Sequence, residues 1–256
     1  MKLNYVDEGN GETLVLIHGL SDNLLYWEVL ATALKKDFRV VRFDLRGHGQ
    51  SPLGEDEITM GTYVNDLKNI LDELNIKKAS LIGFSLGGAV ALDFAVKYPD
   101  YVSSMVLMST FSKCDDHVVD MFNQFNHALE GGFETFYDFM VPKVLCPDVI
   151  ESNREELEFL KQIASKTANV DAFKKAVDAC MDFNVDDELS QIDVPVLVLC
   201  GKYDEIFPMY IHKNISCKIN NSKLIVLDNS RHNLLVGENN IKVIDALNDF
   251  LKKEKK

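Results

Sequence analysis

The chain has 256 residues, of which 46% are hydrophobic, and its formal net charge at pH 7 is −13. This length suits one α/β domain that carries an insertion, or two small domains. The negative charge argues against nucleic acid or an anionic membrane as a partner, because both call for basic patches on the protein.

The cysteines and the N-terminal segment indicate the compartment. Five cysteines are widely spaced and include no C-x-x-C pair, which is typical of free thiols in a reducing cytosol and indicates neither a disulfide framework nor a zinc site. The first residues contain no apolar segment of signal-peptide length, and no stretch approaches the ~20 apolar residues that span a bilayer. We therefore expect a cytoplasmic protein without integral membrane association, either a monomer or a homodimer.

Short β-rich runs alternate with amphipathic helical patterns along most of the chain. This alternation predicts an α/β fold with a mostly parallel, twisted sheet covered by helices on both faces. Several strand candidates are continuous apolar runs, as expected of strands buried on both faces. The expected strands are 2–6, 13–18, 39–44, 79–84, 104–108, 196–200 and 223–227, and the expected helices among them are 23–34, 63–74, 86–98, 208–219 and 241–251.

The alternation breaks between about 111 and 192. Helical patterns occur there around 117–129, 133–140, 154–167 and 170–180, with no convincing strand. We expect residues 112–190 to form a helical cap, or lid, inserted into a core made of residues 1–111 and 191–256. The segment 112–190 contains 17 acidic and 7 basic residues and so carries −10 of the net charge, which is typical of a solvated outer face.

The sequence G-F-S-L-G at 83–87 is the most informative motif. It lies between an apolar strand candidate and a helix candidate, and G-x-S-x-G in that setting is typical of a nucleophile elbow. The residues two positions before and after the serine must be small, because their side chains would otherwise collide across the sharp turn. Gly83 and Gly87 meet this demand, so Ser85 is the predicted nucleophile.

A serine that attacks a carbonyl also requires two donors aimed at the developing oxyanion. The backbone N–H of Leu86 is one candidate, since it follows Ser85 and opens a helix. The loop after the second strand, which reads His18-Gly19-Leu20, offers the Leu20 N–H as the other. We expect the His18 ring to bind neighbouring backbone and not to act as the base.

The serine hydroxyl needs a base to take its proton. His127, His212 and His232 lie downstream, where a base is expected from the chain order serine, acid, histidine. His232 is the strongest candidate because it follows the strand 223–227 and so lies at its carboxyl end, on the same sheet edge as the serine.

An acid must orient that base. Asp204 follows the buried strand 196–200 and ends at the same edge, although an aspartate here could also simply cap a turn. Asp115 and Asp116, after the strand ending near 108, offer an alternative position.

Five motifs in this order resemble the α/β-hydrolase superfamily, specifically its small lidded esterases, enol-lactonases and C–C hydrolases. They are H-G-L-S at 18–21, F-D-L-R-G-H-G-Q-S at 43–51, G-F-S-L-G-G at 83–88, P-V-L-V-L-C-G-K-Y-D at 195–204 and R-H-N at 231–233. The resemblance implies a triad of Ser85, Asp204 and His232 that needs no metal or cofactor, and a lid inserted after the sixth canonical strand. It also implies that Asp44, Arg46 and His48 shape the floor of the site. Family members usually begin with an extra edge hairpin, so we expect that edge to be short or missing here.

These features predict a serine hydrolase that cleaves small to medium carboxylic esters or lactones through an acyl-enzyme. A C–C bond hydrolase or lyase is an alternative, but polyanionic substrates would call for pocket arginines and the proposed lid has only Arg154. A perhydrolase shares the triad, and a ligand sensor with little turnover could retain it. Substrate choice depends on the lid, whose aromatic and methionine side chains either line an acyl pocket or form ordinary core: Phe122, Phe125, Phe133, Phe136, Tyr137, Phe139 and Met140.

Overall fold

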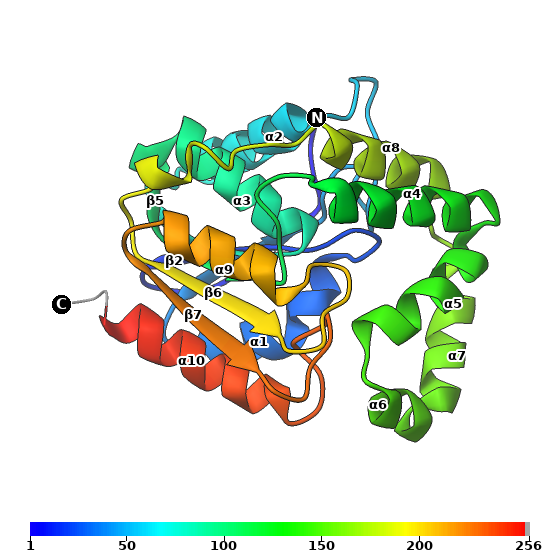
Figure 1. Cartoon of the computed structure of the whole chain (residues 1–256). Helices are drawn as coiled ribbons and strands as arrows, with labels where there is room; N and C mark the ends of the chain where they lie inside the picture. Colours follow the sequence, from blue (N-terminus) through cyan, green and yellow to red (C-terminus); the bar gives the residue numbers. More distant parts are fainter. Residues whose placement is uncertain (254–256) are drawn as a thin grey trace.

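The computed structural model describes residues 1–253 and contains one seven-stranded sheet (Figure 1). The strand order is β1-β3-β2-β4-β5-β6-β7, and every neighbouring pair is parallel except β1 with β3. The strands are β1 (Tyr5–Gly9), β2 (Thr13–Ile17), β3 (Arg39–Phe43), β4 (Ala79–Phe84), β5 (Val102–Met108), β6 (Val196–Gly201) and β7 (Ser222–Leu227). The predicted fold class is correct, because crossover helices connect the parallel strands.

Helices cover both faces of the sheet. One face packs against α1 (Glu28–Leu34) and α10 (Asn239–Lys253), and the other packs against α2 (Met60–Glu73), α3 (Leu86–Lys97) and α9 (Met209–Lys218). The central strands are buried on both sides, which explains their continuous apolar runs. Within residues 1–253, no helix is long and apolar enough to cross a membrane.

The first strand begins three residues later than predicted. Its partner β3 sets its register, with Tyr5 opposite Phe43 and Gly9 opposite Arg39. Its polar side chains form ion pairs across the pairing, since Asp7 binds Arg39 at 2.7 Å. The prediction followed the apolar residues before this strand, but backbone pairing and ion pairs determine its position.

Five helices lie between β5 and β6, in the segment expected to form the lid (Figure 1). They are α4 (Asp116–Glu130), α5 (Phe133–Val144), α6 (Pro147–Ser152), α7 (Arg154–Ala164) and α8 (Val170–Met181). The short α6, which starts on a proline, was not predicted. The apolar side chains of α4 and α8 belong to the same hydrophobic cluster as α2 and α3, so these two helices pack directly on the core.

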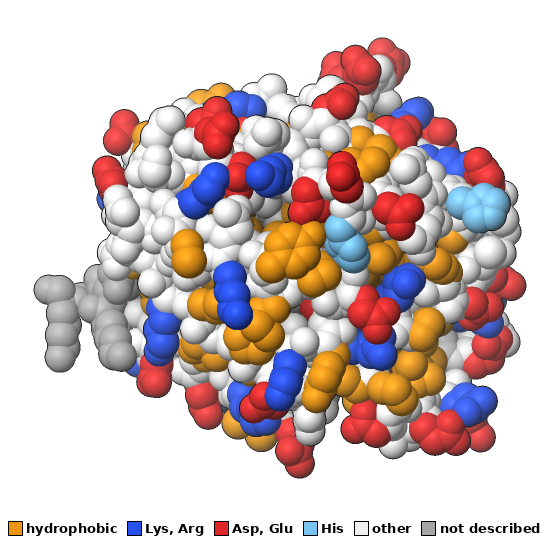
Figure 2. Space-filling model, in the orientation of Figure 1, with side chains coloured by type: hydrophobic (Ala, Val, Ile, Leu, Met, Phe, Trp, Pro, Cys, Tyr) orange, Lys and Arg blue, Asp and Glu red, His pale blue; other side chains and the backbone are white. Residues whose placement is uncertain are grey.

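The two ends of this helical segment are tied together. Lys113 and Asn184 form an antiparallel bridge, and the Val185 N–H donates to the Ser112 oxygen at 2.8 Å. Asp186 is buried at this junction, where it accepts from the Ser112 hydroxyl at 2.8 Å. Acidic side chains spread over the molecular face seen in Figure 2, with Lys and Arg among them.

Candidate active site

Ser85 stands at the turn between β4 and α3, and its backbone adopts an unusual conformation. Its φ of 52° and ψ of −120° lie outside the regions that residues with side chains usually occupy. A Cβ on Gly83 would lie 2.4 Å from the Gly87 oxygen, and a Cβ on Gly87 would lie 2.0 Å from the Ile17 oxygen. Glycine is therefore required at both positions, and the G-x-S-x-G motif forms the strand–turn–helix geometry that it predicts.

Thr110, which follows β5, forms a hydrogen bond with this turn. Its Oγ1 donates to the Ser85 carbonyl oxygen at 2.7 Å, and its backbone N–H donates to His212 Nε2 at 3.1 Å. Burial of His212 in α9 lowers its pKa to about 4. This candidate base is therefore a neutral hydrogen-bond acceptor in the core.

The loop after β2 reaches the same turn. A Cβ on Gly19 would lie 3.2 Å from the Ser85 Cβ, and the Leu20 side chain lines the cavity beside Ser85. The His18 ring holds the loop, since its Nδ1 lies 2.8 Å from the Gly19 oxygen and its Nε2 accepts from the Leu45 N–H at 2.9 Å. Burial lowers the pKa of His18 to about 3, so its ring is neutral and binds backbone as expected.

The two predicted oxyanion donors belong to the residue after Ser85 and to the β2 loop that approaches it. Leu86 is the first residue of α3, and the first N–H groups of a helix have no acceptor within the helix. The helix dipole also concentrates positive charge at that end. Leu20 lies in the β2 loop, where the neighbouring Gly19 approaches Ser85 and the Leu20 side chain lines the same cavity, so the two amides belong to separate elements.

Asp204 and His232 form a buried pair. Asp204 Oδ2 lies 2.9 Å from His232 Nδ1, and the two side chains are 0% and 4% exposed. The other carboxylate oxygen, Oδ1, accepts from the backbone N–H groups of Ile206 and Phe207 at 2.9 and 3.0 Å. One aspartate therefore caps its turn and also binds the histidine. A proton shared with Asp204 on Nδ1 leaves the lone pair on Nε2.

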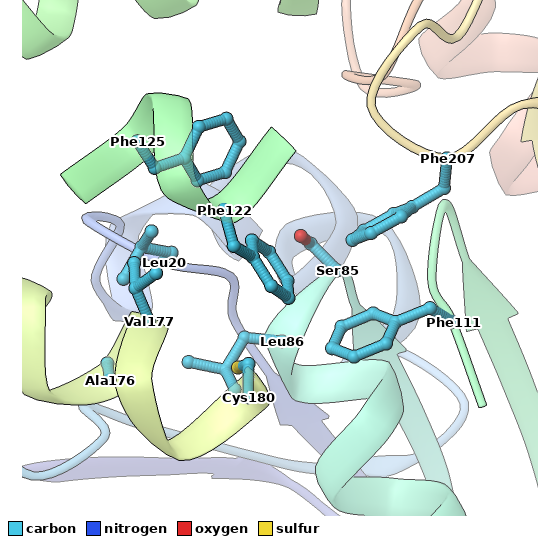
Figure 3. A pocket seen from close by; sticks show the side chains of 10 residues that line it. All are labelled: Leu20, Ser85, Leu86, Phe111, Phe122, Phe125, Ala176, Val177, Cys180 and Phe207. Carbon is cyan, nitrogen blue, oxygen red and sulfur yellow. The ribbon is translucent and has the colours of Figure 1, made fainter. Parts of the chain in front are cut away.

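Two aromatic rings near Ser85 pack against His232. The Phe84 ring centroid lies 5.1 Å from the His232 centroid, and the Phe207 centroid lies 5.4 Å from it. Phe84 directly precedes Ser85, while Phe207 lines the cavity into which the Ser85 side chain points (Figure 3). Ser85, Asp204 and His232 thus gather at one sheet edge, where β4, β6 and β7 end.

The remaining candidate acids and bases have other partners. His127 is exposed and lies 3.3 Å from a Glu130 carboxylate oxygen. Asp115 caps the start of α4 and accepts from the Tyr210 hydroxyl at 2.7 Å, and Asp116 lies in the first turn of that helix. The alternative acid position therefore serves a helix terminus.

The loop at 43–51 braces the elements under the site. Asp44 accepts from the Leu24 N–H at 2.7 Å, and Arg46 binds both carboxylate oxygens of Asp66 at 2.6 and 2.8 Å. His48 is fully buried, and burial lowers its pKa to about 4. These contacts agree with the structural role that the family resemblance implies.

The cavity in front of Ser85 is small and apolar. The space between these side chains that no atom fills is about 260 Å³ even with open solvent included, so the cavity is narrower than the ~300–1,000 Å³ that is typical of ligand pockets. None of the side chains that line it is charged, and they come from the core loops, from α4 and from α8 (Figure 3). The lining residues are Leu20, Ser85, Leu86, Phe111, Phe122, Phe125, Ala176, Val177, Cys180 and Phe207.

Sequence reasoning identified only part of this lining. Phe122 and Phe125 were candidates and line the cavity, whereas Phe133 and Phe136 are buried against neighbouring aromatic rings. Phe111 and Phe207 were not predicted, nor were the three residues from α8. Phe207 lies three residues after Asp204, so its position just beyond the end of β6 could have indicated it.

The geometry agrees with comparisons to known proteins. A family profile described as the alpha/beta hydrolase fold matches residues 12–238. The chain belongs to the α/β hydrolase family. The segment expected to form a lid lies between the fifth and sixth strands of the sheet seen here.

Relatives in the α/β hydrolase family carry several activities in their names. The chain is 28% identical to the RutD protein of Rhizobium rhizogenes, whose name gives carbamate hydrolysis as a provisional activity, over 91% of this chain and 90% of that one. It is also 28% identical to the pimeloyl-[acyl-carrier protein] methyl ester esterase of Vibrio atlanticus, over 88% of each. The crystal structure of the enol-lactonase from Burkholderia xenovorans superimposes with a TM-score of 0.90 at 24% identity, covering 98% of this chain and 96% of that one. The protein is therefore a hydrolase of this fold.

Proposed function

We propose that the protein hydrolyses carboxylic esters of small, uncharged acyl groups through a Ser85–His232–Asp204 triad. The observation that carries this proposal is the strained Ser85 turn at an apolar cavity whose lining includes Phe207, the ring that packs against His232 of the buried Asp204–His232 pair. The methyl ester esterase among the relatives supports the same class of bond.

The first half of the reaction forms an acyl-enzyme. His232 Nε2 takes the Ser85 hydroxyl proton while Oγ attacks the ester carbonyl carbon. The backbone N–H groups of Leu20 and Leu86 bind the resulting oxyanion, and Asp204 stabilises the imidazolium through Nδ1. The imidazolium then gives its proton to the departing alkoxide, which leaves as the alcohol.

The second half releases the acid. His232 takes a proton from a water molecule that attacks the acyl-enzyme carbonyl, and the same two N–H groups bind the second oxyanion. The proton returns to Ser85 Oγ as the ester bond to the enzyme breaks. All groups needed for these steps are supplied by the protein chain and by water.

The cavity favours a short, uncharged acyl group. Its walls are aromatic and aliphatic, and a charged substrate group would be buried there without a counter-charge, which is costly. The absence of a cationic side chain from the lining also disfavours a polyanionic substrate of the kind expected for a C–C hydrolase.

The test is a series of p-nitrophenyl esters of increasing acyl length. We expect the short esters to be cleaved fastest, with kcat/KM falling once the acyl chain exceeds the cavity. Ser85→Ala and His232→Ala should each lose at least about 10³-fold in kcat, as triad residues do. Ser152→Ala, in α6 outside the cavity lining, is the matched control and should behave as wild type.

Labelling provides an independent readout of the same proposal. A small phosphonate should modify wild type at Ser85 and leave Ser85→Ala unmodified. Wild type that shows neither ester turnover above Ser85→Ala nor an adduct at Ser85 would refute the proposed activity.

A further inference from the structure

The residues on both sides of His232 are bound by the end of one lid helix. Arg231 Nη1 donates to the Pro142 carbonyl oxygen at 2.7 Å, and the Asn233 backbone N–H donates to the Val144 carbonyl oxygen at 3.0 Å. Pro142 and Val144 lie in the last turn of α5. The proposed base is thus flanked by two hydrogen bonds to the same helix terminus.

These contacts satisfy groups that a helix cannot satisfy alone. The last carbonyls of a helix have no N–H partner within it, and a cation near that end is favoured by the helix dipole. In α5 the last helical bond runs from the Leu145 N–H to the Val141 oxygen at 3.0 Å. Arg231 and the Asn233 N–H supply further donors, and the Arg231 side chain is only 21% exposed.

Arg231 also binds the loop that carries the acid. Its Nη1 lies 2.7 Å from Glu205 Oε1, and Glu205 directly follows Asp204. The Glu205 carbonyl oxygen is in turn 3.0 Å from His117 Nε2 on α4. One guanidinium therefore joins the end of α5 to the loops after β6 and β7, which hold the acid and the base.

The helices α5, α6 and α7 bury few side chains completely. No residue of α6 or α7 is buried, and the buried residues of α5 are confined to Phe133 and Phe136 in its first half. In Figure 1, α5, α6 and α7 lie beside the ends of β6 and β7, apart from the helices that cover the sheet. Apolar side chains of α7, including Phe159 at 61% exposure, face solvent, and Figure 2 shows hydrophobic groups exposed over this part. The far end of α5 is therefore held by these polar contacts together with partly buried side chains, such as Val144, that pack against the core.

We propose that Arg231 is a positioning residue that couples docking of α5 to the placement of His232. When α5 is docked, both neighbours of His232 are fixed against it. When the contacts break, the His232 loop loses two anchors. This inference rests on the proposed function, because it assigns His232 the role of base.

The kinetic test compares Arg231→Ala, Arg231→Lys and Lys202→Ala. Lys202 is the matched control, since it forms an exposed ion pair with Asp228 on a neighbouring loop. Arg231→Ala should lower kcat roughly tenfold, the order expected for losing a hydrogen bond to a charged group. KM should change little, because α4 and α8 supply the lid side chains that line the cavity, and α5 supplies none. Arg231→Lys should restore part of kcat, and Lys202→Ala should match wild type.

Hydrogen exchange tests the coupling without any substrate. In Arg231→Ala, the amides of Asn233 and Leu145 should exchange faster than in wild type, while those of β4 and β5 should not. Unchanged exchange at both amides would show that Arg231 does not hold α5 against the His232 loop, even if kcat fell. Faster exchange with an unchanged kcat would refute the coupling to His232. A fall in kcat that is explained by a smaller fraction of folded protein would refute it as well. Since the exchange measurement needs no ester, it tests the Arg231 contacts independently of the proposed esterase activity.

Discussion

Replacing His212 tests whether a buried neutral histidine makes the fold sensitive to acid. Burial lowers its folded-state pKa from 6.5 to about 4, and its Nε2 accepts from the Thr110 N–H beneath Ser85. The unfolded chain therefore binds more protons than the folded chain between these two values. Its contribution to stability is complete above about pH 6.5 and is lost as the pH falls towards 4.

The size of this effect follows from proton linkage. Between pH 7 and pH 5 the wild type should lose about 2 kcal/mol of unfolding free energy through His212 alone. His212→Gln cannot titrate, so its loss over the same interval should be smaller by that amount. The other buried histidines, His18, His48 and His232, are present in both proteins and cancel in the comparison.

Urea unfolding at the two pH values measures the difference. The only tryptophan, Trp27, is fully buried and reports unfolding by fluorescence. His127→Gln, at a side chain that is 88% exposed, is the control and should keep the wild-type pH dependence. Equal losses in wild type and His212→Gln would show that His212 is not held neutral in the folded protein.

Two further substitutions test the elbow and the base of the lid. Gly87→Ala should lower the free energy of unfolding in urea by ~3 kcal/mol or more, since its Cβ would lie 2.0 Å from a backbone oxygen of β2. Gly61→Ala on α2 is the control: the nearest atom would lie 3.6 Å from its Cβ, so it should be neutral or stabilising. Equal effects of the two substitutions would refute the packing argument. Although burial alone would raise the pKa of Asp186, hydrogen bonds led by that from Lys218 lower it to about 2, so the benefit of its charge is present above about pH 3.8 and lost as the pH falls towards 2. Asp186→Asn should therefore lower the unfolding free energy by roughly 2–3 kcal/mol at pH 7 and speed amide exchange at Val185, and unchanged exchange there would contradict a clamp at the base of the lid.

The sheet was predictable because its strands carry strong local patterns. Runs such as those of β2 and β6 are apolar throughout, which only strands buried on both faces tolerate. The edge strand β1 was misplaced, since ion pairs such as Asp7–Arg39 and pairing with β3 determine its position. The short α6 was missed because it has six residues, begins at Pro147 and buries none of them, so no periodic apolar face indicates it.

The candidate site was predictable where its residues come directly after a strand in the sequence. Asp204 and His232 each come just after a strand, and parallel strands end at the same edge, so sequence position alone brings their side chains together. The two interpretations of Asp204, as turn cap and as partner of the histidine, are both correct, since its two oxygens serve one role each. The cavity walls could not be predicted, because which faces of α4 and α8 meet above Ser85 depends on how the helices pack and not on local sequence.

The proposed reacting groups and the cavity walls lie on different elements, which explains how one fold can serve relatives named for different bonds. The groups proposed to act on the ester lie on core loops. Close contacts at glycines and hydrogen bonds to backbone atoms hold these loops in place, as at Ser85. Part of the cavity wall comes from α4 and α8, which lie outside the sheet. At the His232 loop, the lid is attached through backbone carbonyls of α5, which any side chain there would still present. The lining of the lid can therefore diverge while its connection to the base persists, provided that Arg231 or an equivalent donor remains.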